Sequence, residues 1–447
     1  MKPTTTPAMT PTMTWVRWRI CGVMFLGAVL GFVDRSSLAV AMPYIRTELH
    51  LSAVQAGYAF TVFLMTYAPA LLISGQIADR YGARGLAAAA ATFWSFCVGL
   101  VAMVGNFPVL IGLRLLLGVA ESGATPSWAK GVSLWFPKRE RGLAVSIYDN
   151  GNRVGNFLAL PIMAGLIGLF GWRMAFVATA LLGLAWVPLW LWIYRVPRQH
   201  PKANAAEIAY IEQGGAMHPD AAPEPVVPWI DLLRHRTTWG LIFICVCLAG
   251  QAYFYIFWIP TYLVEVRHFA LLKVGLVGML PAVGAACGGL TGGIANDIFV
   301  RRGRSVNFAR KSCLAAGLAG ASAVALAAGV DSVVAVVALM VLGYFCNAVA
   351  SVTSFMIPLD LAPVAGRTSS LAAIQTSSTM VGAMVFPLFV GYLLSWTGGS
   401  FIWPFIATGA LSIGGILALL LLVGTIGPLP ILSHPVASAD PSGAAAE

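Results

Sequence analysis

The chain has 447 residues, of which 59% are hydrophobic and 10% are charged, and its mean hydropathy is +0.82. About 25% of the residues of a soluble globular protein are charged, so this composition excludes that class and indicates a polytopic membrane protein. The net charge of +10 does not require a nucleic-acid partner, because most of the 27 Lys and Arg residues fall in segments that the topology below places in the cytoplasm. That asymmetry is the positive-inside rule.

Twelve apolar segments have close to the ~20 residues that a membrane-spanning helix needs. Six of them precede a polar stretch, at about 18–41, 54–77, 86–105, 107–130, 142–168 and 171–194. Six more follow it, at about 238–262, 273–296, 311–330, 333–356, 367–395 and 401–425. We therefore predict an all-α membrane protein with twelve transmembrane helices.

The polar stretch divides the chain into two six-helix bundles, 18–194 and 238–425. Residues 195–237 contain several prolines and many hydrophilic residues, which predicts a cytoplasmic linker with one short helix. The Thr- and Pro-rich residues 1–17 and the tail 426–447 are expected to be disordered and cytoplasmic.

The two halves share a sequence pattern after their second apolar segment. Gly75 and Asp79 are followed by basic residues, and Gly293 and Asp297 are followed by basic residues in the same way. Duplicated halves of this kind place a substrate site near the bilayer midplane, at the interface of the halves. The sequence therefore predicts two pseudo-symmetric bundles with a central site.

The fourth apolar segment carries two ionisable residues, Arg114 and Glu121. Each costs about 2.5–3.5 kcal/mol at mid-bilayer, so both must face a protein interior or a water-filled cavity. Because residues seven apart share a helix face, both side chains can point into one cavity. This indicates a transport pathway or binding site, and a purely structural ion pair that joins two helices is the alternative.

An integral-membrane enzyme finds little support in the sequence. It contains no HExxH, CxxC or glycine-rich phosphate loop, and all six histidines fall in loops or tails. The seven cysteines are scattered without a metal-binding or redox spacing. We therefore expect no catalytic residues, cofactor or bound metal.

The segment after the second apolar region reads GQIADRYGARG, from residue 75 to 85. It resembles the GxxxDRxGxR motif of the major facilitator superfamily, and the fixed positions are occupied by Gly75, Asp79, Arg80, Gly82 and Arg84. The resemblance implies a cytoplasmic gating element that latches the two halves. The alternative is a loop that only holds the topology.

A narrower resemblance rests on the stretches FVDRSSLAVAMPYI (32–45), LRLLLGVAESGATP (113–126) and GWRMAF (171–176). They are similar to the anion:cation symporter branch, whose members move organic anions such as sugar acids and aromatic acids, mostly with protons. The resemblance implies a monomeric symporter of the inner membrane, with both termini cytoplasmic and protons as the second substrate. A facilitator or exchanger of a neutral or anionic solute has the same fold, and insensitivity to a protonophore would identify it.

Carried over to this chain, the conserved acid and base of the family's first helix fall on Asp34 and Arg35, and those of the fourth on Arg114 and Glu121. An arginine stays charged and can hold a substrate carboxylate through two hydrogen bonds. A carboxylate in a poorly hydrated cavity can bind and release a proton near neutral pH. We therefore assign Arg35 to the substrate anion, Glu121 to the proton, Asp34 to coupling, and Arg114 to tuning these acids.

Three further residues of the first half are candidate substrate contacts. Tyr67 matches a family substrate contact, with interhelical packing as the alternative. Asn152 stands where transporters of sugar acids often carry Gln, and its shorter amide leaves the substrate open. Arg153 follows Asp149 by four residues, so the two form an intrahelical pair or Arg153 supplies a second cation for substrates with two anionic groups.

The second half offers polar rather than ionisable candidates for substrate binding. They are Tyr255, Asn347, Ser351 and Gln375. Such groups bind substrate hydroxyls or join helices through hydrogen bonds, and joining helices is the commoner role of polar side chains in membranes.

Overall fold

The computed structural model describes residues 13–214, 232–361 and 367–426, and in these ranges the chain is helical without a strand. The first half comprises α1 (Val16–Leu49), α2 (Ala53–Tyr81), α3 (Ala83–Leu100), η1 (Val101–Met103), α4 (Phe107–Glu121), α5 (Ala124–Trp135) and α6 (Lys138–Ile193). The linker contains η2 (Pro197–Gln199) and α7 (Ala205–Gln213). The second half comprises α9 (Arg236–Phe257), α10 (Ile259–Glu265), α11 (Leu271–Arg301), α12 (Val306–Ser322), η3 (Ala323–Gly329), α13 (Val333–Leu361), α14 (Arg367–Trp396) and α15 (Ile402–Leu421).

Ten helices of the described chain are long and apolar enough to cross a membrane. One of them, residues 139–193 of α6, leaves helical geometry at Gly171, where φ is +78°. The chain reverses its direction at Gly171. The two ends of α6 consequently lie close together, as shown by the hydrogen bond from the indole N–H of Trp135, just before α6, to the carbonyl of Arg195, just after α6. With both arms of α6 counted and α2 added, the described chain has the twelve spans that the sequence predicts.

The helices run further than the apolar segments suggest. α1 continues through Pro43 to Leu49, and α2 and α11 extend to Tyr81 and Arg301. The repeated motif of the two halves therefore lies mainly in the last helical turns of α2 and α11. The ends of the apolar segments had suggested that it lies in loops. Both helices end before a glycine with positive φ, Gly82 at +82° and Gly303 at +77°, a conformation in which glycine is favoured.

The fourth span runs from Phe107 to Trp135, and a turn at Ser122 and Gly123, which keep right-handed helical φ and ψ, separates α4 from α5 within it. This turn is tightly packed. The Ser122 hydroxyl lies 2.7 Å from the hydroxyl of Ser74 on α2, and a Cβ at Gly123 would approach the Ala90 side chain of α3 to 3.0 Å. The carboxylate of Glu121 is thus held at a fixed helix end.

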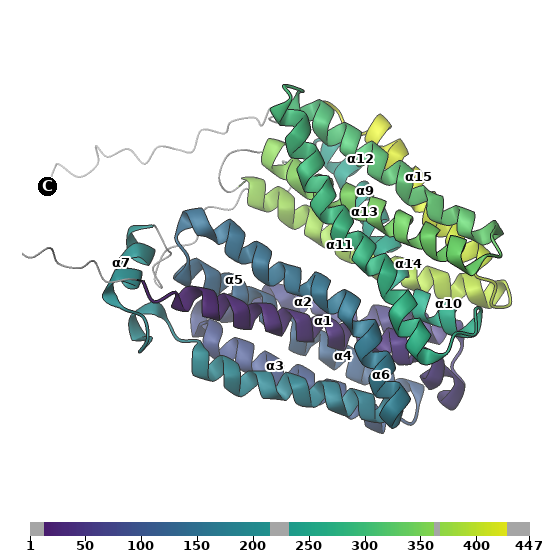
Figure 1. Ribbon diagram of the computed structural model, residues 1–447, viewed down its shortest axis with the longest axis horizontal. Helices are drawn as coiled ribbons and strands as arrows, with labels where there is room; N and C mark the ends of the chain where they lie inside the picture. Colours follow the sequence, from purple (N-terminus) through teal and green to yellow (C-terminus); the bar gives the residue numbers. More distant parts are fainter. Residues whose placement is uncertain (1–12, 215–231, 362–366, 427–447) are drawn as a thin grey trace, which may run out of the picture.

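The two halves lie side by side and join through equivalent elements (Figure 1). α2 packs on α14, and α11 packs on the first arm of α6, so the second span of each half meets the fifth span of the other. Small residues allow the close approach of α2 and α14: a Cβ at Gly391 would lie 2.7 Å from the Ala53 carbonyl oxygen. This pairing is what two pseudo-symmetric bundles require.

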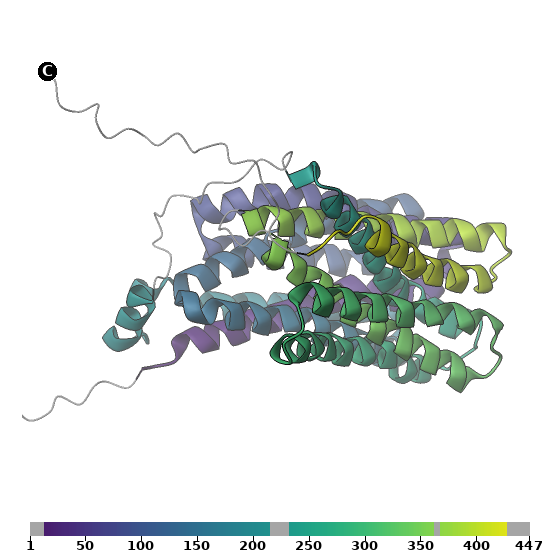
Figure 2. The ribbon, with the colours of Figure 1, turned by 90° about the horizontal axis from the view of Figure 1, so that it is seen from above.

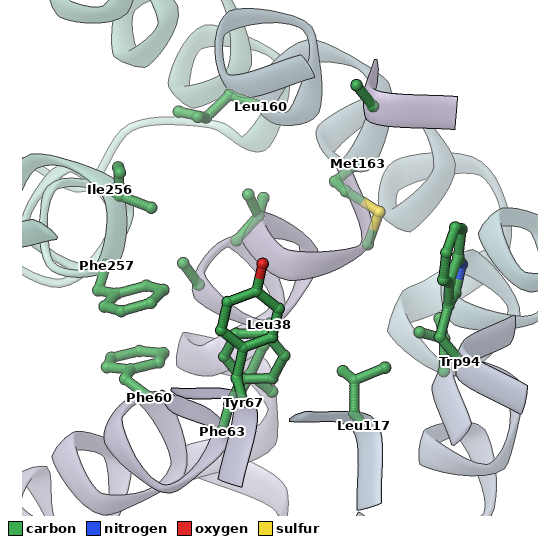
Figure 3. Close-up of a cluster of buried hydrophobic side chains, with 14 of the residues drawn as sticks. Leu38, Phe60, Phe63, Tyr67, Trp94, Leu117, Leu160, Met163, Ile256 and Phe257 are labelled. Carbon is green, nitrogen blue, oxygen red and sulfur yellow. The ribbon is translucent and has the colours of Figure 1, made fainter. Parts of the chain in front are cut away.

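Contacts between the halves gather at one end of the molecule, here called the far end. Arg46 of α1 forms an ion pair with Glu265 of α10 at 2.7 Å, and the hydroxyls of Tyr58 and Tyr392 lie 3.0 Å apart. Deeper in, Phe60 of α2 stacks on the ring of Phe257 with 4.7 Å between centroids (Figure 3). The halves are therefore closed against each other at the far end.

The opposite end, here called the linker end, holds the start of α1 and the linker helix α7 (Figure 2). Glu207 of α7 is fully buried and accepts hydrogen bonds from the Thr14 hydroxyl, the Val16 amide and the Arg17 guanidinium. Residues 14–17 are thus fixed by the linker, whereas the sequence predicted that disorder extends to residue 17. The remaining predicted disorder, in residues 1–12 and 427–447, lies outside the described residues.

Candidate functional site

The centre of the first half contains a buried ion pair between α1 and α4. The guanidinium of Arg35 lies 2.5 Å from the carboxylate of Glu121, and both side chains are mostly shielded from solvent. Neither charge can be hydrated as in water, so each depends on the other for stabilisation. The structure thus joins one residue of the predicted first-helix pair to one of the fourth-helix pair.

Aromatic rings of α2 lie beside this ion pair. The Arg35 guanidinium lies 4.9 Å from the ring centroids of both Phe63 and Tyr67, which stack on each other (Figure 3). The Arg114 guanidinium lies 5.1 Å from the same Phe63 ring. Phe63 therefore contacts two buried cations through its electron-rich face. Phe63 could not be selected from the sequence, because a phenylalanine in an apolar segment carries no distinguishing signal.

Arg114 is 2% exposed and does not pair with Glu121. Its Nε donates to the Ala59 carbonyl of α2 at 3.1 Å, and its Nη2 has no hydrogen-bond partner among the described residues. The seven-residue spacing does place Arg114 and Glu121 on the buried face of α4. Arg114 therefore adds positive charge beside the Arg35–Glu121 pair without neutralising it.

A cavity of about 120 Å³ opens beside the ion pair. Four of the predicted substrate and proton residues line it from four spans: Arg35, Tyr67, Glu121 and Asn152. Polar groups that the sequence analysis did not select also line it: Trp94, Thr125 and Trp128. The indole N–H of Trp128 has no hydrogen-bond partner among the described residues, so it is a free donor at this cavity.

Asp34 does not line this cavity, although it adjoins Arg35 in sequence. It is 4% exposed, faces Trp94 of α3 and Thr179 of α6, and its Oδ2 has no partner in the described chain. Trp94 contacts both Asp34 and the cavity. Asp34 is therefore a second buried acid near the cavity, close enough to Glu121 for the two carboxyl groups to act on each other electrostatically.

Asp149 and Arg153 do not form the intrahelical pair that was one of the two expectations. Asp149 accepts from the Asn152 amide at 3.2 Å, and no ion pair joins it to Arg153 in the ranges described. Arg153 instead faces α11, where a Cβ at Gly289 would lie 3.3 Å from its Nη1. Both charged side chains line a groove of about 190 Å³ between the halves, separate from the Arg35 cavity.

The seventh span contributes two tyrosines with different environments. Tyr253 faces Arg35 and Tyr67 across the interface of the halves. Tyr255, the predicted substrate contact, stacks on Tyr344 with 4.5 Å between ring centroids. Tyr253 is thus the tyrosine of α9 nearest to the ion pair, and the sequence could not select between two tyrosines in one apolar segment.

The other predicted contacts of the second half hydrogen-bond within their own bundle. Asn347 donates to the Leu248 carbonyl and to the Gln251 side chain, and Gln375 donates to the Ser354 carbonyl. These bonds join helices, which was the stated alternative. A substrate would have to displace them to reach either amide donor. Ser351 is only partly buried on α13, and its role as a contact stays a prediction.

The structure describes most of the GxxxDRxGxR motif at the end of α2. Arg84 donates to the Leu191 carbonyl at 2.6 Å, Arg80 lies over the ring of its neighbour Tyr81, and Gly82 ends α2. A Cβ at Gly75 would meet nothing within 4 Å, so no close helix contact forms at this glycine among the described residues. The side chain of Asp79 lies outside the described residues.

A sequence profile of the Major Facilitator Superfamily matches residues 24–378. The chain belongs to this family. Its relatives include the "Probable galactarate/D-glucarate transporter GudP" of Bacillus subtilis, 32% identical over 92% of this chain and 93% of the relative. The "Probable sulfoacetate transporter SauU" of Cupriavidus necator is 31% identical, covering 94% and 96% of the two chains.

A third relative, the "D-galactonate transporter" of Escherichia coli, is 30% identical over 90% of this chain and 95% of its own. The fold is also that of a bacterial homologue of the human lysosomal transporter Spinster, solved in an inward-facing and occupied conformation. The TM-score is 0.73 at 18% identity, with 92% and 95% of the two chains covered. The protein is thus a multi-pass membrane transporter and not an enzyme, as the motifs predicted.

Proposed function

We propose that this transporter couples the uptake of a small organic anion to protons by alternating access. The observation that carries the proposal is the buried Arg35–Glu121 pair, 2.5 Å long, at the edge of a cavity. An arginine that is neutralised only by a titratable acid is suited to exchange that acid for a substrate carboxylate. The relatives named for galactarate, glucarate, galactonate and sulfoacetate transport support an anionic substrate.

The coupling follows from charge balance at Arg35. A substrate carboxylate that binds Arg35 displaces Glu121, which would then be a buried anion without a partner. Because an unpaired buried charge costs several kcal/mol, Glu121 takes a proton as the substrate enters. Arg35 is therefore balanced either by Glu121 or by the substrate while Glu121 carries a proton, and the charge of Arg114 is the same in both states. Substrate without a proton adds one negative charge to the site relative to both of these states, which opposes closure.

Polar groups around the cavity fit a substrate that carries hydroxyls. Tyr67, Thr125 and Asn152 offer donors and acceptors, and the free indole N–H of Trp128 offers one more donor. Arg153, in the neighbouring groove, is placed to meet a second anionic group of a longer substrate. We therefore propose sugar acids as the preferred class, with Asp34 and Arg114 as further members of the coupling machinery.

The orientation follows from charge. The linker end carries most of the Lys and Arg residues, so we place this end and both termini in the cytoplasm. We further propose that the protein is a monomer in the inner membrane. With the far end closed, the conformation described is then inward-facing. The motif of Gly75, Asp79, Arg80, Gly82 and Arg84 lies at the linker end, where it would latch the halves in the outward-facing state.

Uptake into proteoliposomes tests the proposal. Purified protein should accumulate radiolabelled galactarate, glucarate, galactonate or sulfoacetate when an inward proton gradient is imposed, and a protonophore should abolish accumulation. Uptake that is saturable but unaffected by the protonophore would establish the alternative, a facilitator or exchanger. A thermal-shift screen narrows the substrate beforehand, because a ligand at 100 times its Kd stabilises the protein by about 2.7 kcal/mol. The absence of any acid among the hits would contradict the proposal.

A further inference from the structure

A second, larger cavity lies at the linker end of the first half, away from the transport site. Its volume is about 600 Å³, which falls in the ~300–1,000 Å³ range of small-ligand pockets. Three segments enclose it: the turn between α2 and α3, the second half of α5, and the chain just after α6. None of its lining residues lines the Arg35 cavity.

The lining of this cavity is strongly basic. Arg80, Arg84, Lys130 and Arg195 all contribute to it, and no Asp or Glu belongs to the part of the lining that the structure describes. Arg80 and Arg195 are exposed, and neither guanidinium forms an ion pair with a carboxylate in the part of the chain that the structure describes. Such a concentration of cations favours an anionic ligand.

The backbone that carries these cations is held by tryptophans. Trp190 donates its indole N–H to the Arg84 carbonyl at 3.1 Å, and Trp135 donates to the Arg195 carbonyl at 2.9 Å. Arg84 returns a bond to the Leu191 carbonyl at 2.6 Å. The two loops are therefore fixed relative to each other, and the cavity is formed before a ligand arrives.

Tyr194 forms part of the inner wall of the cavity. Its ring lines the cavity, stacks on Trp190 at 4.3 Å and is 1% exposed. Its hydroxyl is buried on the side of Gly131 of α5 and does not open into the cavity. The wall is thus a packed aromatic ring, and the cations around it are the groups that a ligand can reach.

The surroundings of the cavity indicate the level of the lipid headgroups. Tyr81 in the lining is 70% exposed, and the nearby Trp192 is 69% exposed with Lys202 over its ring. Exposed Trp and Tyr residues of membrane proteins concentrate at the membrane–water interface. Trp192 and Arg195 also line an adjoining pocket of about 160 Å³. The basic cavity therefore lies next to the exposed apolar ring of Trp192.

We propose that this cavity binds the phosphodiester headgroup of an anionic phospholipid, such as phosphatidylglycerol or cardiolipin. Arg80 and Arg195 bind the phosphate oxygens, and the acyl chains leave along the exposed ring of Trp192. Basic pockets on the cytoplasmic side of membrane proteins recognise anionic headgroups by this chemistry. Inorganic phosphate shares the chemistry but lacks the acyl chains.

Native mass spectrometry of the delipidated full-length protein tests the proposal. Dioleoyl-phosphatidylglycerol should bind more tightly than dioleoyl-phosphatidylcholine. Arg80→Gln and Arg195→Gln should each weaken phosphatidylglycerol binding about fivefold, the effect of one interfacial cation. The matched control is Arg301→Gln with Arg302→Gln, which removes two exposed cations from the equivalent turn after α11.

Three results would overturn the proposal. The first is unchanged phosphatidylglycerol binding by the Arg80 and Arg195 variants, when melting temperatures equal to wild type show that they are folded. The second is an equal loss in the Arg301 and Arg302 control, which would indicate nonspecific charge attraction. The third is displacement of the lipid by equimolar inorganic phosphate, which would make the cavity a site for a soluble anion.

Discussion

Glu121 at the end of α4 pairs with Arg35 of α1 at 2.5 Å, whereas Arg114, seven residues earlier on the same face, bonds the Ala59 carbonyl of α2. The two charges of α4 therefore have different partners. Glu121 is the group that can leave its partner on taking up a proton, while Arg114 stays charged and packed on the Phe63 ring.

Replacing Glu121 by Gln removes the titratable group and leaves the shape of the site almost unchanged. We expect proton-driven accumulation to be lost, while counterflow between two pools of the same anion persists, because Arg35 still binds the substrate. Both activities are measured in the same proteoliposomes. The control is Glu212→Gln, an exposed linker carboxylate that pairs with Arg198. Accumulation at the wild-type level in Glu121→Gln would remove Glu121 from coupling.

The pair also has a predictable effect on stability. Arg35→Gln leaves Glu121 buried without its partner, and breaking a buried ion pair in this way costs about 3–5 kcal/mol. The double variant Arg35→Gln with Glu121→Gln should recover most of that loss, because neither charge is left unpaired. Unfolding of the purified variants in detergent measures the three free-energy differences. Additive losses in the double variant would mean that the two side chains do not interact.

Arg153 is predicted to distinguish substrates by their charge. It lies in the groove beside the Arg35 cavity, on the face of α6 toward Gly289. Arg153→Gln should weaken the binding of galactarate, which carries two carboxylates, about tenfold or more, and that of galactonate, which carries one, much less. Competition assays with both anions measure the ratio. An equal loss for the two anions would assign Arg153 to the packing of the halves.

The location of the central site could be predicted from the sequence, because charges inside apolar segments are rare and must face the protein interior. Arg35, Glu121, Tyr67 and Asn152 are far apart in the sequence, and the structure places all four at one cavity. Their pairing could not be predicted. The helix face shared by Arg114 and Glu121 does not reveal which residue of another helix each one meets.

The contacts of aromatic and amide side chains were also beyond sequence reasoning. Phe63 and Trp128 stand in apolar segments where their ring contacts leave no pattern, and they were missed. Asn347 and Gln375 carry amide groups of the kind that bind substrates, but in the structure these groups hydrogen-bond to neighbouring helices. Only the tertiary packing distinguishes these roles. Helix ends were likewise misplaced, because Gly82 and not the end of the apolar run terminates α2.

Glu207 should make the anchoring of the linker pH-dependent. Its burial disfavours the charged form, but hydrogen bonds from Thr14, Arg17 and Val16 outweigh burial and lower its pKa below the ordinary 4.5. A lowered pKa in the folded state means that the stabilisation is complete above pH 4.5 and is lost as the pH falls through the lowered value.

We therefore expect Glu207→Gln to destabilise the protein by about 3 kcal/mol at pH 7, because it leaves Arg17 buried with less anionic charge. The difference in Tm between wild type and Glu207→Gln should shrink as the pH is lowered below 4.5. Glu212→Gln, an exposed change on the same helix, controls for charge alone. A difference that stays constant over this pH range would show that the Glu207 carboxylate does not titrate with linker docking.

Closure of the far end depends on the approach of α14 to α2 at Gly391. A Cβ there would lie 2.7 Å from the Ala53 carbonyl oxygen, a backbone atom that cannot move alone. Gly391→Val should therefore push the two helices apart and shift the population toward a conformation that is open at the far end.

The distance between spin labels measures this opening. The labels are placed at the exposed positions Met103 and Val334, at the far end of each half, and their distance is read by double electron–electron resonance. Their distance distribution should move to longer values in Gly391→Val and stay unchanged in Gly112→Val, where a Cβ meets nothing within 4 Å. Equal distributions in both variants would show that this contact does not hold the far end closed.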